Sequence, residues 1–358
     1  MTEEEKIYLN ALNLAFSPYI EGVFKILSQI PSPKEAFFVS KEKLLSLNFK
    51  KETLLKFLQK REKIHPEKEW KKLERMKIRL ITKEDKEYPP LLKKIQKPPL
   101  ALYLKGKILS QDKKFLACVG TRWPSDYGKR VALELVGELS YYFSIVSGMA
   151  RGIDSFCHKA ALLRNNFTVA VLGNGLDITF PPENKKLKKE IEEKGTIISE
   201  FPLSTPPFQF NFPWRNRIIA GMSEGVLVIE AKEKSGALLT ANIALEEGRD
   251  VFSVPGPIFS KTSKGTNKLI KEGAFLVERV SDVLIRFNLE EGMKKEKEIE
   301  LRDENEKQIF KILKEKEASL EEISKKTGLE ISEVTSKLIL MEIEGKVKKI
   351  GEKYYLNF

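Results

Sequence analysis

The stretch FLACVGTRWPSDYGKRVALELVGELSYYFSIVSG, residues 115–148, decides how this chain folds. It begins with a short apolar run ending at Gly120, passes through a proline-containing turn, and enters a helix-length segment before a second apolar run ending at Gly148. Ser125 or Asp126 can cap the start of that helix. The pattern therefore predicts a strand, a tight turn, a helix and a second strand.

Five further apolar runs repeat this plan along the chain: TVAVLG (168–173), TIISEF (196–201), GVLVIEA (225–231), DVFSVPG (250–256) and AFLV (274–277). Unbroken apolar strands that alternate with helices indicate an α/β fold with a parallel sheet covered on both faces. Ligands of such sheets bind beyond the C-terminal ends of the strands. The glycines and polar residues that follow the strands are therefore the candidate site.

The segments on either side of this core, which we place at 115–287, differ from it in composition. Residues 1–66 contain short apolar-patterned runs separated by proline turns, which predicts a small helical domain. Residues 67–114 hold one strand candidate, IRLIT, and paired prolines typical of an extended connector. A charge-rich linker follows over 288–303. Residues 304–358 show three helices and a hairpin bent at Gly351, the order of a winged helix.

The composition excludes several classes of protein. The chain has 358 residues, 41% hydrophobic and 32% charged, and no apolar run approaches the roughly 20 residues that cross a bilayer. Its first residues, MTEEEKIYLN, lack the features of a signal peptide, so we expect a cytoplasmic protein. With only Cys118, Cys157, His65 and His158, we expect neither a disulfide framework nor a zinc cluster.

The formal net charge of +12 is unevenly distributed. Residues 1–100 hold 22 basic and 14 acidic residues, whereas residues 301–358 hold 12 of each. A basic excess favours polyanionic partners through counterion release. The Lys/Glu-rich surface of a heat-adapted protein would explain the same excess, so charge alone does not decide.

Two glycine turns follow the first two strands of the core. In VGTRWPSDYG (119–128), the backbone N–H groups of the turn and the dipole at the start of the helix favour binding of a phosphate group. The guanidinium group of Arg122 adds hydrogen-bond donors whose fixed geometry suits phosphate oxygens. In SGMARGIDSFCHKAAL (147–162), Gly148 and Gly152 allow a ligand to approach the backbone closely, and Arg151 is the side chain we expect to bind it. His158 is predicted to be structural, because the helix around it is apolar.

Three later motifs add aromatic and basic residues. VLGNGLDITFPPEN (171–184) contains a glycine turn and Phe180, which either stacks on a base or packs against the prolines that follow it. FPWRNRIIAG (212–221) places arginines 215 and 217 at a turn before an apolar helix, where they suit phosphate. Lys185 and Lys261 either follow a phosphate chain or are simply solvated.

The usual nucleotide-binding fingerprints are missing. No GxxxxGK[ST] is present, and GNGLDI lacks the third glycine of GxGxxG. Acidic residues are scarce where metal or acid–base chemistry would be done. The sequence therefore predicts binding without turnover, with no catalytic residue, cofactor or metal.

The five motifs, in this order, resemble the DprA/Smf family of bacterial DNA-processing proteins from about Glu87 to Val277. The N-terminal segment resembles the family's sterile-alpha-motif-like domain, and the C-terminal segment its winged helix. The resemblance implies an extended Rossmann-like core, homodimerisation through it, and binding of single-stranded DNA. It further implies protection of incoming strands in natural transformation and loading of a RecA-type recombinase, without catalysis.

The resemblance and the motifs together give a set of candidate DNA-binding residues. Phe180 stands where Tyr is common in the family, which keeps a stacking face, and Lys185 lies at a position that varies. The set is Gly120, Thr121, Arg122, Ser147, Gly148, Arg151, Gly173, Gly175, Phe180, Lys185, Arg215, Asn216, Arg217 and Lys261.

Two other functions remain open at this point. One is a nucleoside-phosphate-hydrolysing enzyme, similar to the lysine-decarboxylase-like Rossmann proteins, which carry PGGxGTxxE. The corresponding stretch here, EKSGALLTANIALEE (233–247), lacks the PGG and the glutamate. Release of free base from nucleoside monophosphates would separate this enzyme from a binding protein. The other is a nucleotide-sensing module with the winged helix as its output.

The third helix of the winged helix, ISEVTSKLILMEIEG (331–345), carries few donors for a DNA groove. It offers Lys337 against Glu333, Glu342 and Glu344. A helix that reads the major groove usually presents donors and cations. We therefore predict that this domain mediates protein contacts or regulation and does not read duplex sequence.

Overall fold

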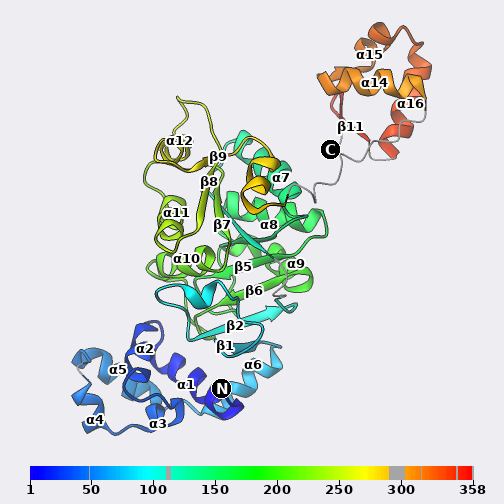
Figure 1. The fold of residues 1–358 in the computed structure, drawn as a ribbon. Coiled ribbons are helices and arrows are strands. Elements are labelled where there is room, and N and C mark those ends of the chain that lie inside the picture. The colour runs from blue at the N-terminus through cyan, green and yellow to red at the C-terminus, as the bar shows by residue number, and fades with distance from the viewer. Residues whose placement is uncertain (48, 110–113, 290–302, 316, 344–345, 357–358) are drawn as a thin grey trace. The chain divides into compact units, whose positions relative to one another are not determined.

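The computed structural model describes residues 1–358 except 48, 110–113, 290–302, 316, 344–345 and 357–358. The chain divides into two compact units, residues 1–289 and 290–358 (Figure 1). Each unit has its own hydrophobic core. No helix in the described ranges combines the length and apolar character that a membrane crossing needs.

The first unit is built on a nine-stranded sheet with the order β1-β2-β6-β5-β4-β3-β7-β8-β9. Strands β3 to β9 are parallel, whereas β2 pairs antiparallel with both β1 and β6. The seven apolar runs of the sequence are these seven parallel strands, so the predicted α/β fold is confirmed. The bounds are β1 Arg79–Thr82, β2 Ala101–Gly106, β3 Phe115–Val119, β4 Ser144–Ser147, β5 Thr168–Leu172, β6 Thr196–Ser199, β7 Gly225–Val228, β8 Asp250–Ser253 and β9 Phe275–Leu276.

Helices cover both faces of the sheet (Figure 1). In β3, Leu116 and Cys118 pack towards one face, while Ala117 and Val119 pack towards the other, as alternation along a strand requires. The first face is covered by α7 (Asp126–Leu139), α8 (Ile153–Leu163), α9 (Lys185–Lys194) and α13 (Val280–Leu284). The second is covered by α10 (Asn211–Gly221), α11 (Gly236–Glu246) and α12 (Lys264–Lys271).

In the described part of residues 1–78, six helices precede the sheet, which agrees with the predicted helical N-terminus. They are α1 Glu3–Phe16, α2 Glu21–Leu27, α3 Pro33–Phe38, α4 Lys41–Ser46, α5 Lys51–Arg61 and α6 Pro66–Arg75. Helix α1 contacts the sheet through Tyr103 of β2, whose hydroxyl donates to Asn10 Oδ1 at 2.8 Å and accepts from Asn13 Nδ2 at 3.1 Å. The helices and the sheet edge therefore share one core.

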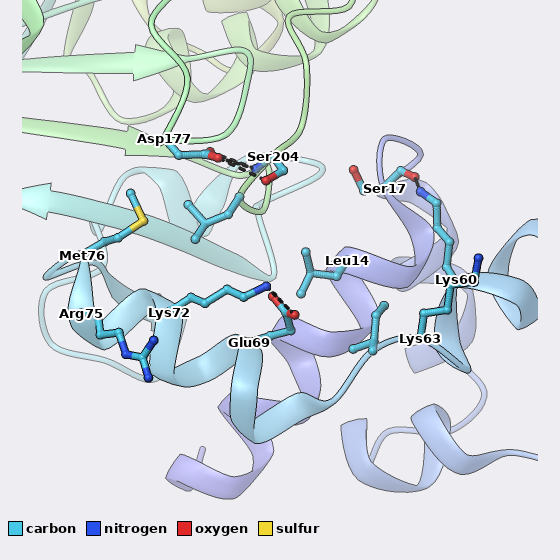
Figure 2. Close-up of a pocket in the computed structure, with 12 residues that line it drawn as sticks. Leu14, Ser17, Lys60, Lys63, Glu69, Lys72, Arg75, Met76, Asp177 and Ser204 are labelled. Carbon is cyan, nitrogen blue, oxygen red and sulfur yellow. Dashed lines mark hydrogen bonds and ion pairs between the residues drawn. The ribbon is translucent and has the colours of Figure 1, made fainter.

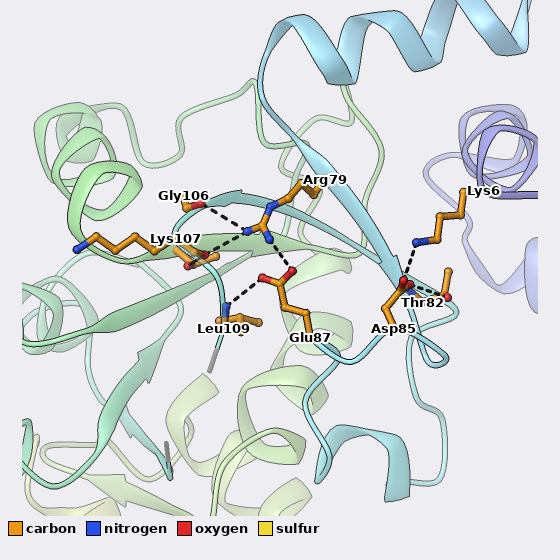
Figure 3. A network of polar contacts seen from close by, with 9 residues as sticks. Lys6, Arg79, Thr82, Asp85, Glu87, Gly106, Lys107 and Leu109 are labelled. Atoms are coloured by element: carbon orange, nitrogen blue, oxygen red, sulfur yellow. Dashed lines mark hydrogen bonds and ion pairs between the residues drawn. The ribbon is translucent and has the colours of Figure 1, made fainter. Parts of the chain in front are cut away.

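Residues 67–114 are more structured than the extended connector that we predicted. They form most of α6, strands β1 and β2, and a polar network around Arg79 (Figure 3). Glu87 accepts from Arg79 Nη1 and, at 2.9 Å, from the Leu109 backbone N–H, while Lys6 of α1 pairs with Asp85 at 2.7 Å. The Lys6–Asp85 pair therefore ties α1 to the edge of the sheet.

The second unit has the element order of a winged helix, as predicted. It comprises α14 Glu304–Glu315, β10 Ala318–Ser319, α15 Leu320–Thr327, α16 Ile331–Ile343, β11 Val347–Ile350 and β12 Lys353–Leu356. Its small sheet has the order β10-β12-β11, over a core that includes Ile309, Ile323 and Leu338. Most of the linker predicted over 288–303, and Glu344, lie outside the described residues.

Candidate nucleic-acid interface

Three loops meet at the C-terminal edge of the sheet, where the sequence predicted the site. Strands β3, β4 and β5 are neighbours and run parallel. The loops that follow them, 120–125, 148–152 and 173–181 in the same order, therefore emerge side by side. The start of α10 contacts the same edge, since Asn211 Nδ2 donates to the carbonyl oxygen of Gly173 at 2.9 Å.

An exposed guanidinium group, two exposed aromatic rings and one half-buried ring lie at this edge. The Arg122 guanidinium carbon lies 5.9 Å from the centroid of the half-buried Phe212 ring, which stacks in turn on Phe180 at 5.6 Å and 30°. Phe180 is 37% exposed, and Trp123, next to Arg122 in the chain, is 70% exposed. We call Arg122, Trp123, Phe180 and Phe212 the rim surface. It combines a positive charge with ring faces that can stack on bases.

The turn that carries Arg122 is held from both sides. The Thr121 N–H donates to Glu230 O at 2.7 Å, and Thr121 O accepts from Ile153 N at 3.1 Å. Gly120 lacks a side chain because a Cβ there would lie 2.7 Å from Ile153 Cβ. Thr121 is consequently buried, and the next side chain, Arg122, is directed outward.

Part of the predicted phosphate cradle is already occupied by a carboxylate of the chain itself. Asp154 Oδ2 accepts from the Gly148 N–H at 3.1 Å, and the backbone at Gly120 and Ala150 also stabilises this carboxylate. Burial raises the pKa of Asp154, while the positive charge of Arg215 and these backbone hydrogen bonds act in the opposite direction. The fold itself therefore uses these N–H groups, and a ligand that approaches Gly148 meets a backbone donor that is already paired.

The start of α7, where the sequence also predicted a phosphate, is capped in the same way. Glu230, two residues beyond the end of β7, accepts from Ser125 N at 2.9 Å, from Ser125 Oγ at 2.6 Å and from Thr262 Oγ1 at 2.8 Å. A carboxylate is stabilised at a helix N-terminus for the same electrostatic reason as a phosphate. The crevice between β3 and β7, where the strand order reverses, thus contains a buried glutamate.

Ser147, the last residue of β4, and Gly173 and Gly175, in the loop after β5, serve the packing of the fold. The Ser147 hydroxyl is fully buried and donates to Cys118 O at 2.7 Å. A Cβ at Gly173 would lie 2.9 Å from the Phe212 ring, so this glycine makes room for a ring of the rim surface. The Gly175 N–H donates to Thr205 O at 2.9 Å.

The RNR element is buried within α10, not exposed in a turn before it. Arg215 Nη1 donates to Gly148 O at 2.9 Å and also to Val171 O, and Asn216 accepts from Arg215 Nε at 3.2 Å. Burial lowers the pKa of Arg215 to about 10, so this side chain remains charged at neutral pH. Arg215 therefore holds the loop after β4 against strand β5 through their carbonyl groups, and a direct contact with a ligand is not expected of it.

Arg217 makes a separate buried cluster. Its guanidinium pairs with Glu200, donates to Lys97 O at 2.7 Å, and lies 4.5 Å from the Trp214 ring centroid. Burial raises the pKa of Glu200, and the charge of Arg217 acts against this. We conclude that Arg217 stabilises α10.

The remaining candidates are exposed at the sheet edge. Arg151 pairs with Glu183, and this contact raises the pKa of Arg151 and lowers that of Glu183. Lys185, at the start of α9, and Lys261, beside the Thr262 that binds Glu230, are both exposed. All three are therefore accessible to a phosphate chain.

Sequence reasoning missed two members of the rim surface. Trp123 was passed over although it follows Arg122 in a proline-containing turn, where a large ring has little to pack against. Phe212 was quoted within FPWRNRIIAG, but its role depends on contacts with Arg122 and Phe180, which are far away in the chain.

Two family models match the chain. Residues 79–288 match "DNA recombination-mediator protein A", and residues 294–351 match "DprA winged helix domain". Among curated proteins, Protein Smf of Escherichia coli is 44% identical over 223 residues, which are 62% of this chain and 59% of that protein. DNA processing protein DprA of Bacillus subtilis is 42% identical over 209 residues, 58% of this chain and 70% of that protein.

Two solved structures are also similar. The X-ray structure of DNA processing protein A from Streptococcus pneumoniae superposes with a TM-score of 0.65 at 33% identity, covering 80% of this chain and 98% of that one. The structure of DNA processing protein A from Helicobacter pylori, whose description concerns its single-stranded DNA binding mode, gives a TM-score of 0.53 at 29% identity. It covers 59% of this chain and 96% of that one. The chain spans between half and three fifths of the length of the Smf proteins of Escherichia coli and Synechocystis.

Proposed function

The chain belongs to the DNA recombination-mediator protein A family, and from this premise we propose that it binds single-stranded DNA at the rim surface and releases it chemically unchanged. In this proposal it protects incoming strands during transformation and delivers them to a RecA-type recombinase in the cytoplasm. It would act as a homodimer formed through the Rossmann-like core.

One observation carries the proposal, namely the exposed Arg122 guanidinium beside the stacked rings of Phe212 and Phe180. Ring faces stack on unpaired bases of any sequence, whereas the bases of a duplex are already stacked on one another. The guanidinium adds phosphate binding without base recognition. This combination favours single strands and predicts little dependence on sequence.

The carboxylates at the sheet edge argue against the alternative of nucleoside-phosphate hydrolysis. Asp154 and Glu230 are buried and accept hydrogen bonds from the backbone and from hydroxyl groups of the fold. A general base must be within reach of a substrate proton, and these two groups are engaged in holding the loops. We therefore propose a binding protein without catalysis.

The test is the affinity for a fluorescent oligo-dT, measured by anisotropy. We expect Arg122→Ala to weaken binding about tenfold or more, because it removes a phosphate contact and the cation next to Phe212. Its thermal unfolding should match that of the parent, since Arg122 is exposed.

The matched control is Arg130→Ala, which removes an exposed arginine that is 76% accessible and paired with Glu134 on α7. It should leave the affinity unchanged. Equal affinities of the parent and Arg122→Ala would contradict the assignment of the site.

A further inference from the structure

Three exposed aromatic rings stack on one another where the N-terminal helices meet the core. Phe210 pairs with Tyr19 at a centroid distance of 5.7 Å and with Phe208 at 5.4 Å, with an interplanar angle of 5° in each pair. The exposed fractions of Tyr19, Phe210 and Phe208 are 54%, 48% and 39%. We call these residues the aromatic stack. Exposed, nearly parallel rings are the arrangement on which single-stranded nucleic acids lay their bases.

The stack joins segments that are far apart in the sequence, and polar contacts hold them together. Tyr19 follows α1, whereas the two phenylalanines precede α10. The hydroxyl groups of Ser17 and Thr205 lie 3.0 Å apart, and Lys60 Nζ of α5 donates to Ser17 O at 2.5 Å. Lys60 is thereby fixed beside the rings, lining the same hollow as Tyr19 and Phe210.

A larger cavity of about 570 Å³ continues from Ser17 and Lys60 (Figure 2). Lys60, Lys63, Lys72 and Arg75 line it, and Lys63 and Arg75 have no acidic partner among the residues that the structure describes.

The two acids of this cavity are already engaged. Glu69 pairs with Lys72 at 2.7 Å, and Asp177 accepts from Ser204 N at 2.9 Å. The cavity therefore presents net positive charge beside the aromatic stack, a combination suited to a phosphate chain with unpaired bases.

The aromatic stack is continuous in the chain with the rim surface. The segment FQFNF, residues 208–212, carries aromatic rings at alternate positions. Phe208 and Phe210 belong to the stack, while Phe212 packs on Phe180 of the rim surface. The Cα atoms of residues two apart in the chain are separated by at most about 7 Å. The aromatic stack and the rim surface are therefore adjacent along this segment.

We propose that the single strand continues from the rim surface over residues 208–212 to the aromatic stack and to the cavity lined by Lys60, Lys63, Lys72 and Arg75. This second contact rests on the proposed function and adds to it a longer binding path and a role for the N-terminal helices. A strand long enough to reach both surfaces binds more tightly than one that covers the rim surface alone, because each surface raises the effective concentration of the strand at the other.

The test compares oligo-dT of two lengths, about 6 and about 24 nucleotides. The short one can cover only the rim surface, whereas the long one can reach the aromatic stack as well. The double variant Tyr19→Ala, Phe210→Ala of the full chain should weaken binding of the long oligonucleotide about tenfold and leave the short one unchanged. Phe38→Ala is the matched control, since Phe38 is an exposed ring of the same helical segment, 61% accessible, outside the stack. It should change neither affinity.

If the variant that lacks the two rings is unstable, a second variant that removes positive charge from the cavity tests the same proposal. The double variant Lys63→Gln, Arg75→Gln alters only exposed side chains. For the long oligonucleotide, the slope of log K against the logarithm of the salt concentration should become shallower by about 0.7 for each lost phosphate contact. Unchanged long-strand affinity and salt dependence would overturn the proposal, as would an equal loss at both lengths. Arg122→Ala distinguishes the two proposals, because it should weaken both lengths if the rim surface binds DNA and neither if the proposed function itself is wrong.

Discussion

His158 is fully buried on α8, with Nδ1 2.7 Å from Thr168 Oγ1. The Thr168 hydroxyl donates to Ile145 O at 2.8 Å, so it can only accept from the imidazole, and the proton lies on Nδ1. Burial, with a smaller effect from the charge of Arg215, lowers the pKa of His158 to about 3. The structure thus agrees with the prediction that this histidine is structural.

This burial predicts that acid destabilises the protein. Below pH 6.5 the unfolded chain binds a proton that the folded imidazole, with its pKa of about 3, does not accept. The contribution of His158 is therefore complete above pH 6.5 and is lost as the pH falls towards 3. The loss is about 1.4 kcal/mol per pH unit, or about 2 kcal/mol between pH 6.5 and 5.

The measurement is urea unfolding of the parent and of His158→Gln at pH 7 and pH 5. Asp154 and Glu200, whose pKa values are raised, change stability in the opposite direction in both proteins, so the difference isolates the imidazole. The parent should lose about 2 kcal/mol more than the variant. Parallel losses would contradict this assignment.

At the residue scale the sequence predicted which residue types gather at the sheet edge, but not which of them are exposed. Arg122, Arg215 and Arg217 look alike in a sequence, yet only the first is exposed. The other two are buried because carbonyl groups and Glu200 from distant loops satisfy them. Such pairing depends on the tertiary fold, so local pattern cannot reveal it.

Among the elements, α16 bears on the prediction that the winged helix does not read a DNA groove. Lys337, its one cation, is paired with Asp303. Ile331, Ile339 and Leu340 are between 39% and 49% exposed, which leaves an apolar surface on this helix. Exposed apolar side chains favour a protein contact over the sugar-phosphate backbone.

Deletion of residues 301–358 should therefore leave single-strand affinity nearly intact. The rim surface and the aromatic stack both lie within residues 1–289, which have a hydrophobic core of their own. The anisotropy titration of the truncated chain against the full chain measures this. A loss of more than about tenfold would show that the winged helix contributes directly to binding.

Elements were predicted best where the apolar pattern was strongest. Strands β3 to β8 are buried, so their sequences are continuous apolar runs that stand out from the helices, whereas Phe275 and Leu276 of the edge strand β9 are 42% and 44% exposed. Strand β2 was missed because the prolines at 98 and 99, just before Ala101, suggested an extended connector. Its strand character comes from pairing with β1 and β6, which the sequence does not display.

For the molecule as a whole, the unevenness of the charge now has a structural counterpart. The excess of 22 basic over 14 acidic residues in positions 1–100 includes the four cations of the cavity beside the aromatic stack. The second unit, with 12 of each in residues 301–358, has no such excess. Electrostatic attraction for a polyanion is therefore concentrated in the first unit, where both proposed contacts lie.

The selection of an unpaired strand by exposed rings and Arg122 underlies both proposed contacts. The direct measurement is a competition in which labelled oligo-dT, bound to the full chain, is displaced by unlabelled single-stranded or duplex DNA of equal length over a series of salt concentrations. We predict that the single strand competes at least about a hundredfold better and that affinity falls steeply with salt. Equal competition by the duplex would contradict the account, because duplex bases cannot stack on these rings.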